Sequence, residues 1–266
     1  MSESILFFVP MYCCSPQIGR VIAQFEQLAG MNAPHAILCV DNRSPDDTLA
    51  AAERALAALS VQNKCLVRND DNYGLGGSHK VAFDYARDHG FDHVVVLHGD
   101  DQGSIADLLP LLRKGAHTHV DALLGARFMS GSRLEGYSAF RTWANRGFNL
   151  IFSIVAGKTL SDLGSGLNLF RRAPFDHGFH RKYADDLTFN YYLIFGLADH
   201  GLRFRFFPIS WREDDQVSNV KLFSHAKRML ALLWNRMTRP KAFHSAEYRM
   251  TSRESYPYTV MRTWEK

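Results

Sequence analysis

Asp100, Asp101 and Gln102 stand together directly after a short apolar stretch of the sequence. Two carboxylates and an amide oxygen in one turn suit a hard divalent cation, Mg²⁺ or Mn²⁺, that bridges to a diphosphate. His98 is a further candidate ligand, although a histidine at the end of a strand more often forms structural hydrogen bonds. An acidic pair in such a place is also commonly a helix cap or a turn. The residues alone therefore leave a metal site and a turn both open.

Polar clusters also follow three other apolar runs of the chain. They consist of Pro10, Met11 and Tyr12, then residues 41–44, then residues 72–77 with the sequence NYGLGG. In an open parallel sheet, ligands bind at the carboxyl ends of the strands. If the apolar runs are strands of one such sheet, all four clusters line one edge of it.

The elements that must position these clusters follow a regular repeat. Five β-type runs start 28 to 31 residues apart, which is the length of a strand–helix–strand unit. Helical patterns separate them. Ser15 as N-cap and Pro16 in the first turn open the clearest one, and Ser44 with Pro45 opens the next. The alternation predicts an α/β fold, Rossmann-like, with a mostly parallel sheet covered by helices on both faces. The runs cover residues 5–9, 36–40, 65–68, 93–97 and 122–126.

The repeat ends after Arg127, and a second half of the chain begins there. In this half we expect a helix near residues 143–154 and strands at 167–170 and 203–209. The last 25 or so residues show no clear period. No internal repeat and no linker is evident.

The composition is that of a folded protein, with 46% hydrophobic and 22% charged residues, and it excludes disorder, collagen and low complexity. The longest apolar run, residues 191–198, is far shorter than the roughly 20 residues of a membrane-spanning helix. The first basic residue is Arg20, so we expect no signal peptide and a cytoplasmic protein. The four cysteines form neither a CxxC pair nor a disulfide framework, and we expect reduced thiols.

A basic C-terminal part distinguishes the end of the chain. Residues 203–266 contain 13 Lys or Arg against 6 Asp or Glu. This excess of positive charge favours binding to phosphates or to an anionic membrane surface. The alternative is a basic face that contacts only solvent. An amphipathic helix is expected over residues 222–237, and it predicts peripheral contact with the inner face of the membrane. The open alternative is packing on the protein's own core. The apolar face contains Leu222, Ala226, Met229, Leu230, Leu233 and Met237, and the basic residues are Lys227, Arg228, Arg236, Arg239 and Lys241.

Two common nucleotide-binding folds do not fit. A dinucleotide-binding Rossmann fold needs its glycine-rich turn after the first strand, but here the first strand leads into PMYCCSP and the turn GLGG follows the third. A phosphate-binding P-loop is excluded because no GxxxxGK[ST] occurs. The sheet must therefore bind its ligand in another way, or bind none.

Taken together, the clusters resemble the family 2 glycosyltransferases with the GT-A fold. Within that family, the resemblance is to polyprenol-phosphate sugar synthases such as dolichyl-phosphate mannose synthase. It runs from about residue 5 to residue 221. The motifs are VPMY (9–12), VDNRSPDDT (40–48), NYGLGGSHKVAFDYA (72–86), HGDDQ (98–102), GARF (125–128) and DLGSGLNLFRR (162–172).

The resemblance assigns roles to residues by matching position. It implies a nucleotide pocket with Asp41 accepting hydrogen bonds from the base and with glycine letting the backbone approach the ligand. Asp41 could instead be an N-cap or a turn residue. The glycine-rich segment could instead be an ordinary turn that contacts no ligand. The implied pocket is lined by Pro10, Tyr12, Asp41, Asn72 and Gly74.

The resemblance also implies how the diphosphate and the acceptor are held. Asp100 takes the last acidic position of the metal motif with Gln102 beside it, and Arg127 is the diphosphate contact, unless it merely faces solvent. Residues 162–168 are the acceptor-side loop, with Asp162 and Ser165 as its polar members, although Asp162 could equally cap a helix.

Several positions depart from the family pattern. His98 stands at the first acidic position of the metal motif, and Cys13 and Cys14 replace the Asn and Glu that usually follow the tyrosine. The acidic residue expected in the late helix falls near Tyr192, so its role could pass to Asp185 or Asp186. The basic phosphate loop could correspond to Arg212, Ser218 and Lys221, with three extra residues.

We therefore expect a metal-dependent, inverting transferase that moves a sugar from a nucleotide diphosphate sugar to polyprenyl phosphate or a glycan hydroxyl. If the acceptor is a hydroxyl, Asp185 or Asp186 would be the general base. If the acceptor is a lipid phosphate, no base is needed, and Arg212 and Lys221 would position that phosphate. A nucleotide-sugar sensor and a nucleotidyltransferase are the rivals, and no nucleic-acid partner is expected. The expected domain covers residues 1–221, with halves 1–127 and 128–221, followed by an amphipathic helix and basic tail at 222–266.

Overall fold

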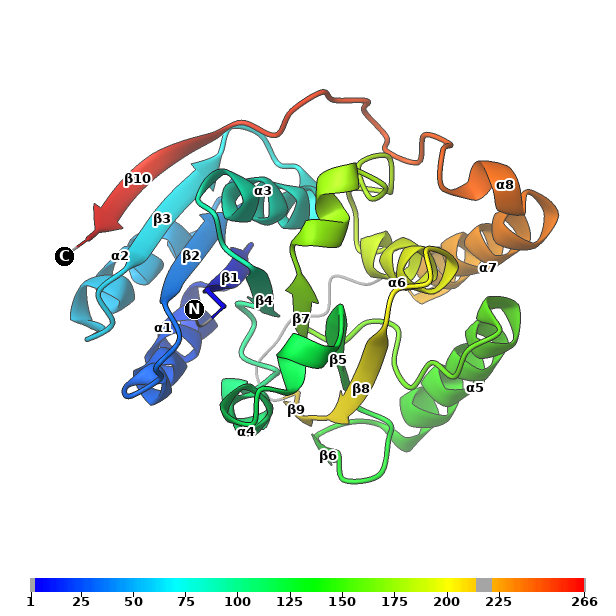
Figure 1. Cartoon of the computed structure of the whole chain (residues 1–266), viewed down its shortest axis with the longest axis horizontal. Coiled ribbons are helices and arrows are strands. Elements are labelled where there is room, and N and C mark those ends of the chain that lie inside the picture. The colour runs from blue at the N-terminus through cyan, green and yellow to red at the C-terminus, as the bar shows by residue number, and fades with distance from the viewer. Residues whose placement is uncertain (1–2, 214–221, 266) are drawn as a thin grey trace.

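A computed structural model describes residues 3–213 and 222–265 of the chain. Its centre is an eight-stranded sheet in the order β10-β3-β2-β1-β4-β7-β5-β8, and β6 pairs with β9 apart from it (Figure 1). The strands are β1 (Ile5–Met11), β2 (His35–Asp41), β3 (Lys64–Asn69), β4 (His93–Leu97), β5 (Ala122–Ala126), β6 (Arg133–Glu135), β7 (Leu167–Arg171), β8 (Phe204–Pro208), β9 (Ser210–Arg212) and β10 (Tyr258–Trp264).

Strand direction decides where the polar clusters meet. β1 is parallel to β2 and β4, and β2 is parallel to β3, so their carboxyl ends lie at one edge. β7 lies between β4 and β5 and is antiparallel to both. β10 closes the far side by pairing antiparallel with β3. The predicted α/β fold with a mostly parallel sheet is therefore confirmed.

Helices cover both faces of this sheet. They are α1 (Ser15–Ala23), α2 (Thr48–Ala58), α3 (Gly74–Asp88), α4 (Leu109–Arg113), α5 (Ala139–Ala156), α6 (Phe189–Asp199), α7 (Leu222–Thr238) and α8 (Pro240–Phe243), with 3₁₀-helices η1 (Gln24–Leu28), η2 (Ile105–Asp107), η3 (Ala116–His119) and η4 (Ala173–His177). Figure 1 shows α5, α7 and α8 at the end of the molecule opposite β10.

The alternation of side chains along each strand builds two apolar layers. In β1, Phe7 and Val9 pack with α1, α2 and α4, whereas Leu6 and Phe8 pack with α3, α6 and α7. Because the centre of the sheet is covered on both faces, its central strands β1 and β4 are buried along their whole length rather than alternating with exposed residues.

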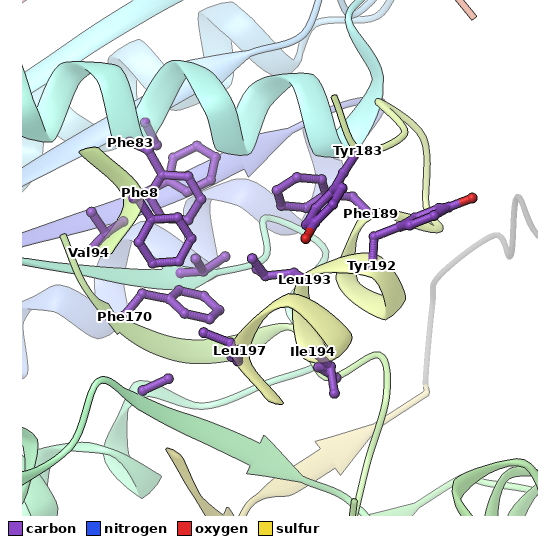
Figure 2. Packing of buried hydrophobic residues seen from close by; sticks show 14 of the residues in the cluster. Phe8, Phe83, Val94, Phe170, Tyr183, Phe189, Tyr192, Leu193, Ile194 and Leu197 are labelled. Atoms are coloured by element: carbon purple, nitrogen blue, oxygen red, sulfur yellow. The ribbon is translucent and has the colours of Figure 1, made fainter. Parts of the chain in front are cut away.

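Aromatic rings fill the layer between the sheet and α6. Phe83 of α3 stacks on Phe175, with ring centroids 4.2 Å apart, and meets Phe170 of β7 edge on at 5.9 Å. Figure 2 shows Phe8, Phe83 and Phe170 facing one another, with Leu193 and Leu197 of α6 pointing toward the same region. Each such fully buried side chain contributes roughly 1.5–3 kcal/mol of hydrophobic stabilisation, so this layer fixes α6 against the sheet.

The helix starts differ slightly from those predicted. Cys14 is the N-cap of α1 and Ser15 is its first residue, so the predicted N-cap is one residue too late. α2 begins at Thr48 with Asp47 as N-cap, because residues 44–46 serve the loop: Ser44 donates from its backbone amide to Asp41, and Asp46 accepts from Thr48. Both helices exist where the sequence predicts them.

The C-terminal part differs more from the prediction. In α7, Met229 and Leu233 are buried with Leu232 on the core, whereas Leu230 and Met237 are exposed. The predicted single apolar face is therefore wrong for these residues, since packing on the protein's own core takes part of it; the side chain of Leu222 lies outside the described residues. In the described ranges, no helix is long and apolar enough to cross a membrane.

Candidate active site

Asp41 ends β2 at the centre of the carboxyl edge. It stands beside Met11 of β1 and Arg68 of β3 in the register of the sheet. Its side chain is fully buried, its Oδ2 lies 3.1 Å from Nε of Arg68, and its Oδ1 accepts a hydrogen bond from the amide of Ser44 at 3.2 Å. The carboxylate is therefore held by Arg68 and by the loop after β2, and its predicted contact with the base stays a prediction.

Asn42, which the sequence places in the cluster after the second apolar run without a role of its own, joins three segments of the edge. Its Nδ2 donates to Oδ1 of Asn72 at 2.8 Å, and its Oδ1 accepts from Nδ2 of Asn69 at 2.9 Å and from the amide of Tyr73 at 2.8 Å. Oδ1 of Asn72 also accepts from the amide of Gly74 at 3.0 Å. The predicted pocket residue Asn72 is thus held by the chain itself. The available signal was the place of Asn42 directly after a strand.

The glycine-rich turn makes its close approach to another part of the protein. Gly74 has a φ of +71°, and a Cβ there would lie 2.5 Å from the carbonyl oxygen of Asp185. The same oxygen accepts a hydrogen bond from the amide of Gly76 at 2.7 Å, which satisfies a donor of the first turn of α3. Glycine here therefore allows a contact between the two halves of the chain, and its predicted approach to a ligand stays a prediction.

Pro10 and Tyr12 flank the end of β1. Pro10 is buried within the strand, and its carbonyl accepts a hydrogen bond from the amide of Gly99 at 3.1 Å. Tyr12 follows the strand with 45% of its side chain exposed. Tyr12 is therefore an exposed aromatic ring at this edge, and its predicted contact with the nucleotide stays a prediction, while Pro10 ties β1 to the loop after β4.

The loop after β4 contains the acidic motif. Burial raises the pKa of Asp100 to about 6, and the nearby charge of Arg127 opposes that shift. The amide of Gln102 donates to Oδ1 of Asp100 at 3.2 Å, so these two predicted metal ligands share one turn. Gln102 also lines a cavity of about 340 Å³ together with Arg20 and Arg212.

Asp101 has a separate, structural role in this loop. It has a φ of +59°, is 1% exposed, and accepts a hydrogen bond from Nε of Arg20 at 2.6 Å. The side chain of Arg212 binds both its backbone carbonyl, at 3.0 Å, and its carboxylate. Two arginines thus hold Asp101 in a strained conformation. Arg212 thus lies at this loop, and its predicted contact with a phosphate stays a prediction.

His98 and Cys14, which replace acidic residues of the family pattern, lie close to the motif. Burial lowers the pKa of His98 to about 4, its Nε2 is buried without a hydrogen-bond partner, and its ring packs against Gly166 and His79. Burial raises the pKa of Cys14 to about 12, and the charge of Asp100 adds to the shift. Both side chains are therefore neutral at pH 7, so neither restores the missing negative charge.

Arg127 follows β5 and forms a tightly bound pair with Asp162. Its Nε and Nη2 donate to the two carboxylate oxygens at 2.7 and 2.8 Å, and its guanidinium lies 4.9 Å from the centre of the Trp211 ring. Ser165 of the same predicted acceptor loop is buried and bonds to the backbone of Leu167. Asp162 therefore orients Arg127, and Ser165 shapes the turn into β7.

Asp185 and Asp186 precede α6, and both carboxylates are engaged. Oδ1 of Asp185 accepts from Nζ of Lys80 at 2.6 Å and from the hydroxyl of Tyr256 at 2.8 Å. Oδ1 of Asp186 accepts from the amide of Thr188 at 2.8 Å, and its Oδ2 pairs with Arg228 at 2.5 Å. Lys80 was not singled out from the sequence, where it reads as an ordinary helix residue.

Comparison with known proteins decides the family. The family model described as "Glycosyl transferase family 2" matches residues 7–179. The chain belongs to glycosyl transferase family 2. It is therefore an enzyme that transfers a sugar from a nucleotide sugar, and the recognition made from the motifs is confirmed.

Solved structures similar to this glycosyltransferase share its fold. Glucosyl-3-phosphoglycerate synthase from Mycobacterium tuberculosis, in complex with uridine diphosphate, has a TM-score of 0.64 at 16% identity, over 88% of this chain and 80% of that one. Mannosyl-3-phosphoglycerate synthase from Rubrobacter xylanophilus has a TM-score of 0.59 at 15% identity, over 99% and 87%. At these identities the likeness supports the fold alone.

The glycosyltransferase edge thus brings together most of the predicted residues. Asp41, Asn72, Asp100 and Arg127 follow four strands that end at or beside the same side of the sheet. Lys221 and Ser218 lie outside the described residues. Their predicted roles in binding, like those of the edge residues, stay predictions.

A second group of metal-ligand type lies far from this edge. Ligand atoms of Glu3, His93 and His117 are within 4.8 Å of one another. His93 begins β4, whereas Asp100 follows its end, so the group lies at the opposite side of the sheet. It has no part in the glycosyltransferase site.

Proposed function

We propose that the enzyme transfers a sugar, with inversion, from a nucleoside diphosphate sugar to the phosphate of an acceptor, and that this acceptor is polyprenyl phosphate. The observation that carries the proposal is the state of the two candidate bases. Asp185 is bound by Lys80 and Tyr256, and Asp186 by Thr188 and Arg228. A hydroxyl acceptor needs a general base, whereas a phosphate monoester is already ionised near neutral pH.

The acidic loop fits a divalent cation. Asp100 and Gln102 offer oxygen ligands within one turn, which Mg²⁺ and Mn²⁺ prefer. With a pKa of about 6, raised by burial, Asp100 is ionised above that pH. Arg127 beside it is compensated by Asp162 and repels a cation less than an unpaired arginine would. A bound cation would neutralise the negative charge of the leaving diphosphate.

Solved structures of similar fold support this choice of cation and donor. Glucosyl-3-phosphoglycerate synthase from Mycobacterium tuberculosis has been solved with Mn²⁺, uridine diphosphate glucose and phosphoglyceric acid, and with Mg²⁺ and uridine diphosphate. The first of these complexes also contains a phosphate-bearing small molecule. That molecule also carries a hydroxyl group, so the choice of a phosphate oxygen as the acceptor atom rests on the state of Asp185 and Asp186 and not on that complex.

The transfer balances without a proton acceptor. The bond between the anomeric carbon and the diphosphate oxygen breaks, and a phosphate oxygen of the acceptor forms the new bond from the opposite face. The products are a nucleoside diphosphate and a sugar phosphodiester. Arg127, held by Asp162 near Asp100, would place guanidinium hydrogen-bond donors where the diphosphate leaves. Tyr12, exposed at the end of β1, would contact the nucleotide.

The test compares three acceptors at equal concentration with radiolabelled donors. Purified enzyme with Mn²⁺ and uridine diphosphate glucose or guanosine diphosphate mannose receives a short polyprenyl phosphate, the matching polyprenol, or an oligosaccharide. We expect transfer to the polyprenyl phosphate alone, in an acid-labile product. Transfer to the polyprenol or the oligosaccharide would refute the phosphate acceptor, and binding of donor without turnover on any acceptor would favour the sensor.

A further inference from the structure

Large apolar side chains are exposed in unusual number on α5 and α7. Trp143 of α5 is 71% exposed and Trp234 of α7 is 67% exposed. Monomeric proteins rarely expose a continuous apolar surface of this kind without a partner. We call the set the apolar stripe. It consists of Phe140, Trp143, Leu150, Ile151, Ile154, Leu230, Trp234 and Met237.

The stripe is one continuous face on each helix. On α5 its members recur at spacings of three, four and seven residues, which places them within an arc of about 100°. The opposite side of α5 buries Asn149 and Phe152. On α7, Leu230, Trp234 and Met237 follow the same rule, and Met229, Leu232 and Leu233 face the core. The stripe is therefore what remains after each helix has packed on the protein.

The two helices lie together. α5 and α7 contact each other directly, and both lie at the end of the molecule opposite β10 (Figure 1). At its N-terminal end α7 reaches the acceptor side, because Arg228 pairs with Asp186 before α6. The surface that carries the stripe thus begins next to Asp186, one of the two candidate bases.

The charged residues of the two helices themselves are all basic. The sequences of α5 and α7 contain no Asp or Glu and contain five Lys or Arg. Arg141, Arg228 and Arg236 pair with acidic residues of other segments. Exposed Lys227, Arg146, Arg239 and Lys241 remain at the surface, and Arg146 lies 5.5 Å from the centre of the Trp143 ring.

This combination fits a lipid surface. Helices that lie in the membrane interface combine Trp, Phe and Leu on one face with Lys and Arg beside it, and tryptophan is enriched at the level of the headgroups. A second copy of the chain fits less well, because a symmetric contact would bring the same basic residues against each other. We propose that α5 and α7 dock the protein on anionic membranes through the apolar stripe. Docking does not depend on the proposed transfer reaction.

The experiment measures binding of the full chain to vesicles that contain no acceptor, so that its outcome is separate from catalysis. The vesicles are phosphatidylcholine alone, or phosphatidylcholine with about one third phosphatidylglycerol. The test variant carries Trp143→Gln, Ile154→Gln and Trp234→Gln. The matched control carries Gln at Met250, Val260 and Met261, which are exposed apolar residues away from both helices. Circular dichroism checks that each variant is folded.

We expect the wild type and the control to sediment with the anionic vesicles, and the test variant to bind at least about tenfold more weakly. Binding should weaken with salt, and Lys227→Glu, Arg239→Glu and Lys241→Glu should each lower it by about fivefold or more. Equal binding of the test variant and the wild type, or no binding of the wild type, would overturn the proposal. The proposal would also be overturned if the wild type formed a dimer and did not bind vesicles, and if the test variant were a monomer. The stripe would then join two copies of the chain.

Discussion

The ion pair between Lys80 and Asp185 offers the sharpest test of how the acceptor side works. Lys80 is fully buried, and its ammonium donates to Asp185, to the carbonyl of Tyr183 and to the hydroxyl of Tyr256. Burial lowers its pKa from 10.5 to about 8, even though Asp185 opposes the shift. Replacing Asp185 with Asn removes that opposition. We expect Lys80 then to lose its proton in the folded state.

The free-energy cost of Asp185→Asn should depend on pH in a characteristic way. In the wild type below pH 8, Lys80 is protonated both folded and unfolded, and its burial costs about 3 kcal/mol at every such pH. In the variant, folding must release the proton, which costs about 1.4 kcal/mol for each unit below 10.5. The variant is therefore less stable than the wild type by about 1 kcal/mol at pH 7.5 and by about 3 kcal/mol at pH 6. The lost hydrogen bond to Asp185 adds about 1 kcal/mol at every pH.

Urea unfolding of the wild type and the variant between pH 6 and 8 measures this difference. A Lys80→Met background removes the titrating group, so Asp185→Asn should then cost the same at every pH. Asp176→Asn, which breaks a more exposed pair with Arg172, should cost less than about 1 kcal/mol without a pH trend. A pH-independent cost for Asp185→Asn, joined to a loss of turnover of about 10²-fold or more, would refute this reasoning and identify Asp185 as a general base.

Two further predictions concern the metal loop and the glycine turn. Asp100→Asn should abolish Mn²⁺-dependent binding of uridine or guanosine diphosphate, measured by calorimetry at pH 7.5. In the wild type, this binding should weaken below pH 6, because burial raises the pKa of Asp100 to about 6 and the carboxylate then gains a proton. Unchanged affinity in the variant would exclude Asp100 as a metal ligand. Gly76→Ala should destabilise by about 1–3 kcal/mol in thermal unfolding, because its Cβ would lie 2.5 Å from the carbonyl of Ala184 and 2.6 Å from Cβ of Phe189. Gly147→Ala, with open space around its Cβ, should stabilise by about 0.5–1 kcal/mol, and equal effects of the two would contradict the packing argument.

The local pattern of the sequence was enough for the first half of the sheet. Its strands are continuous apolar runs with a regular spacing, so each could be found from its own residues. β10 could not, since all seven of its side chains are half-buried or exposed and it has no apolar face to reveal it. Its partner, β3, lies far away in the chain.

Within the site, only the residues that end or directly follow a strand could be predicted from the sequence. Asp41, Asp100 and Arg127 could be placed at the sheet edge for that reason. The burial of Lys80 could not be predicted, because its partner Asp185 is 105 residues away. Likewise, the hydrogen bonds of Asn42 depend on Asn69 and Asn72, which a different turn after β3 would move out of reach.

The late strand β10 also has a consequence for how the chain is made. Tyr256, just before β10, donates to Asp185 and accepts from Lys80, from which it is separated by 176 residues. A ribosome releases β1 to β4 long before this segment, and until it arrives the edge of β3 is an unpaired strand that invites wrong pairing. We expect a nascent chain that stops before residue 256 to be digested readily by protease and to bind no donor. Folding of the donor-binding half is thereby tied to the synthesis of β10.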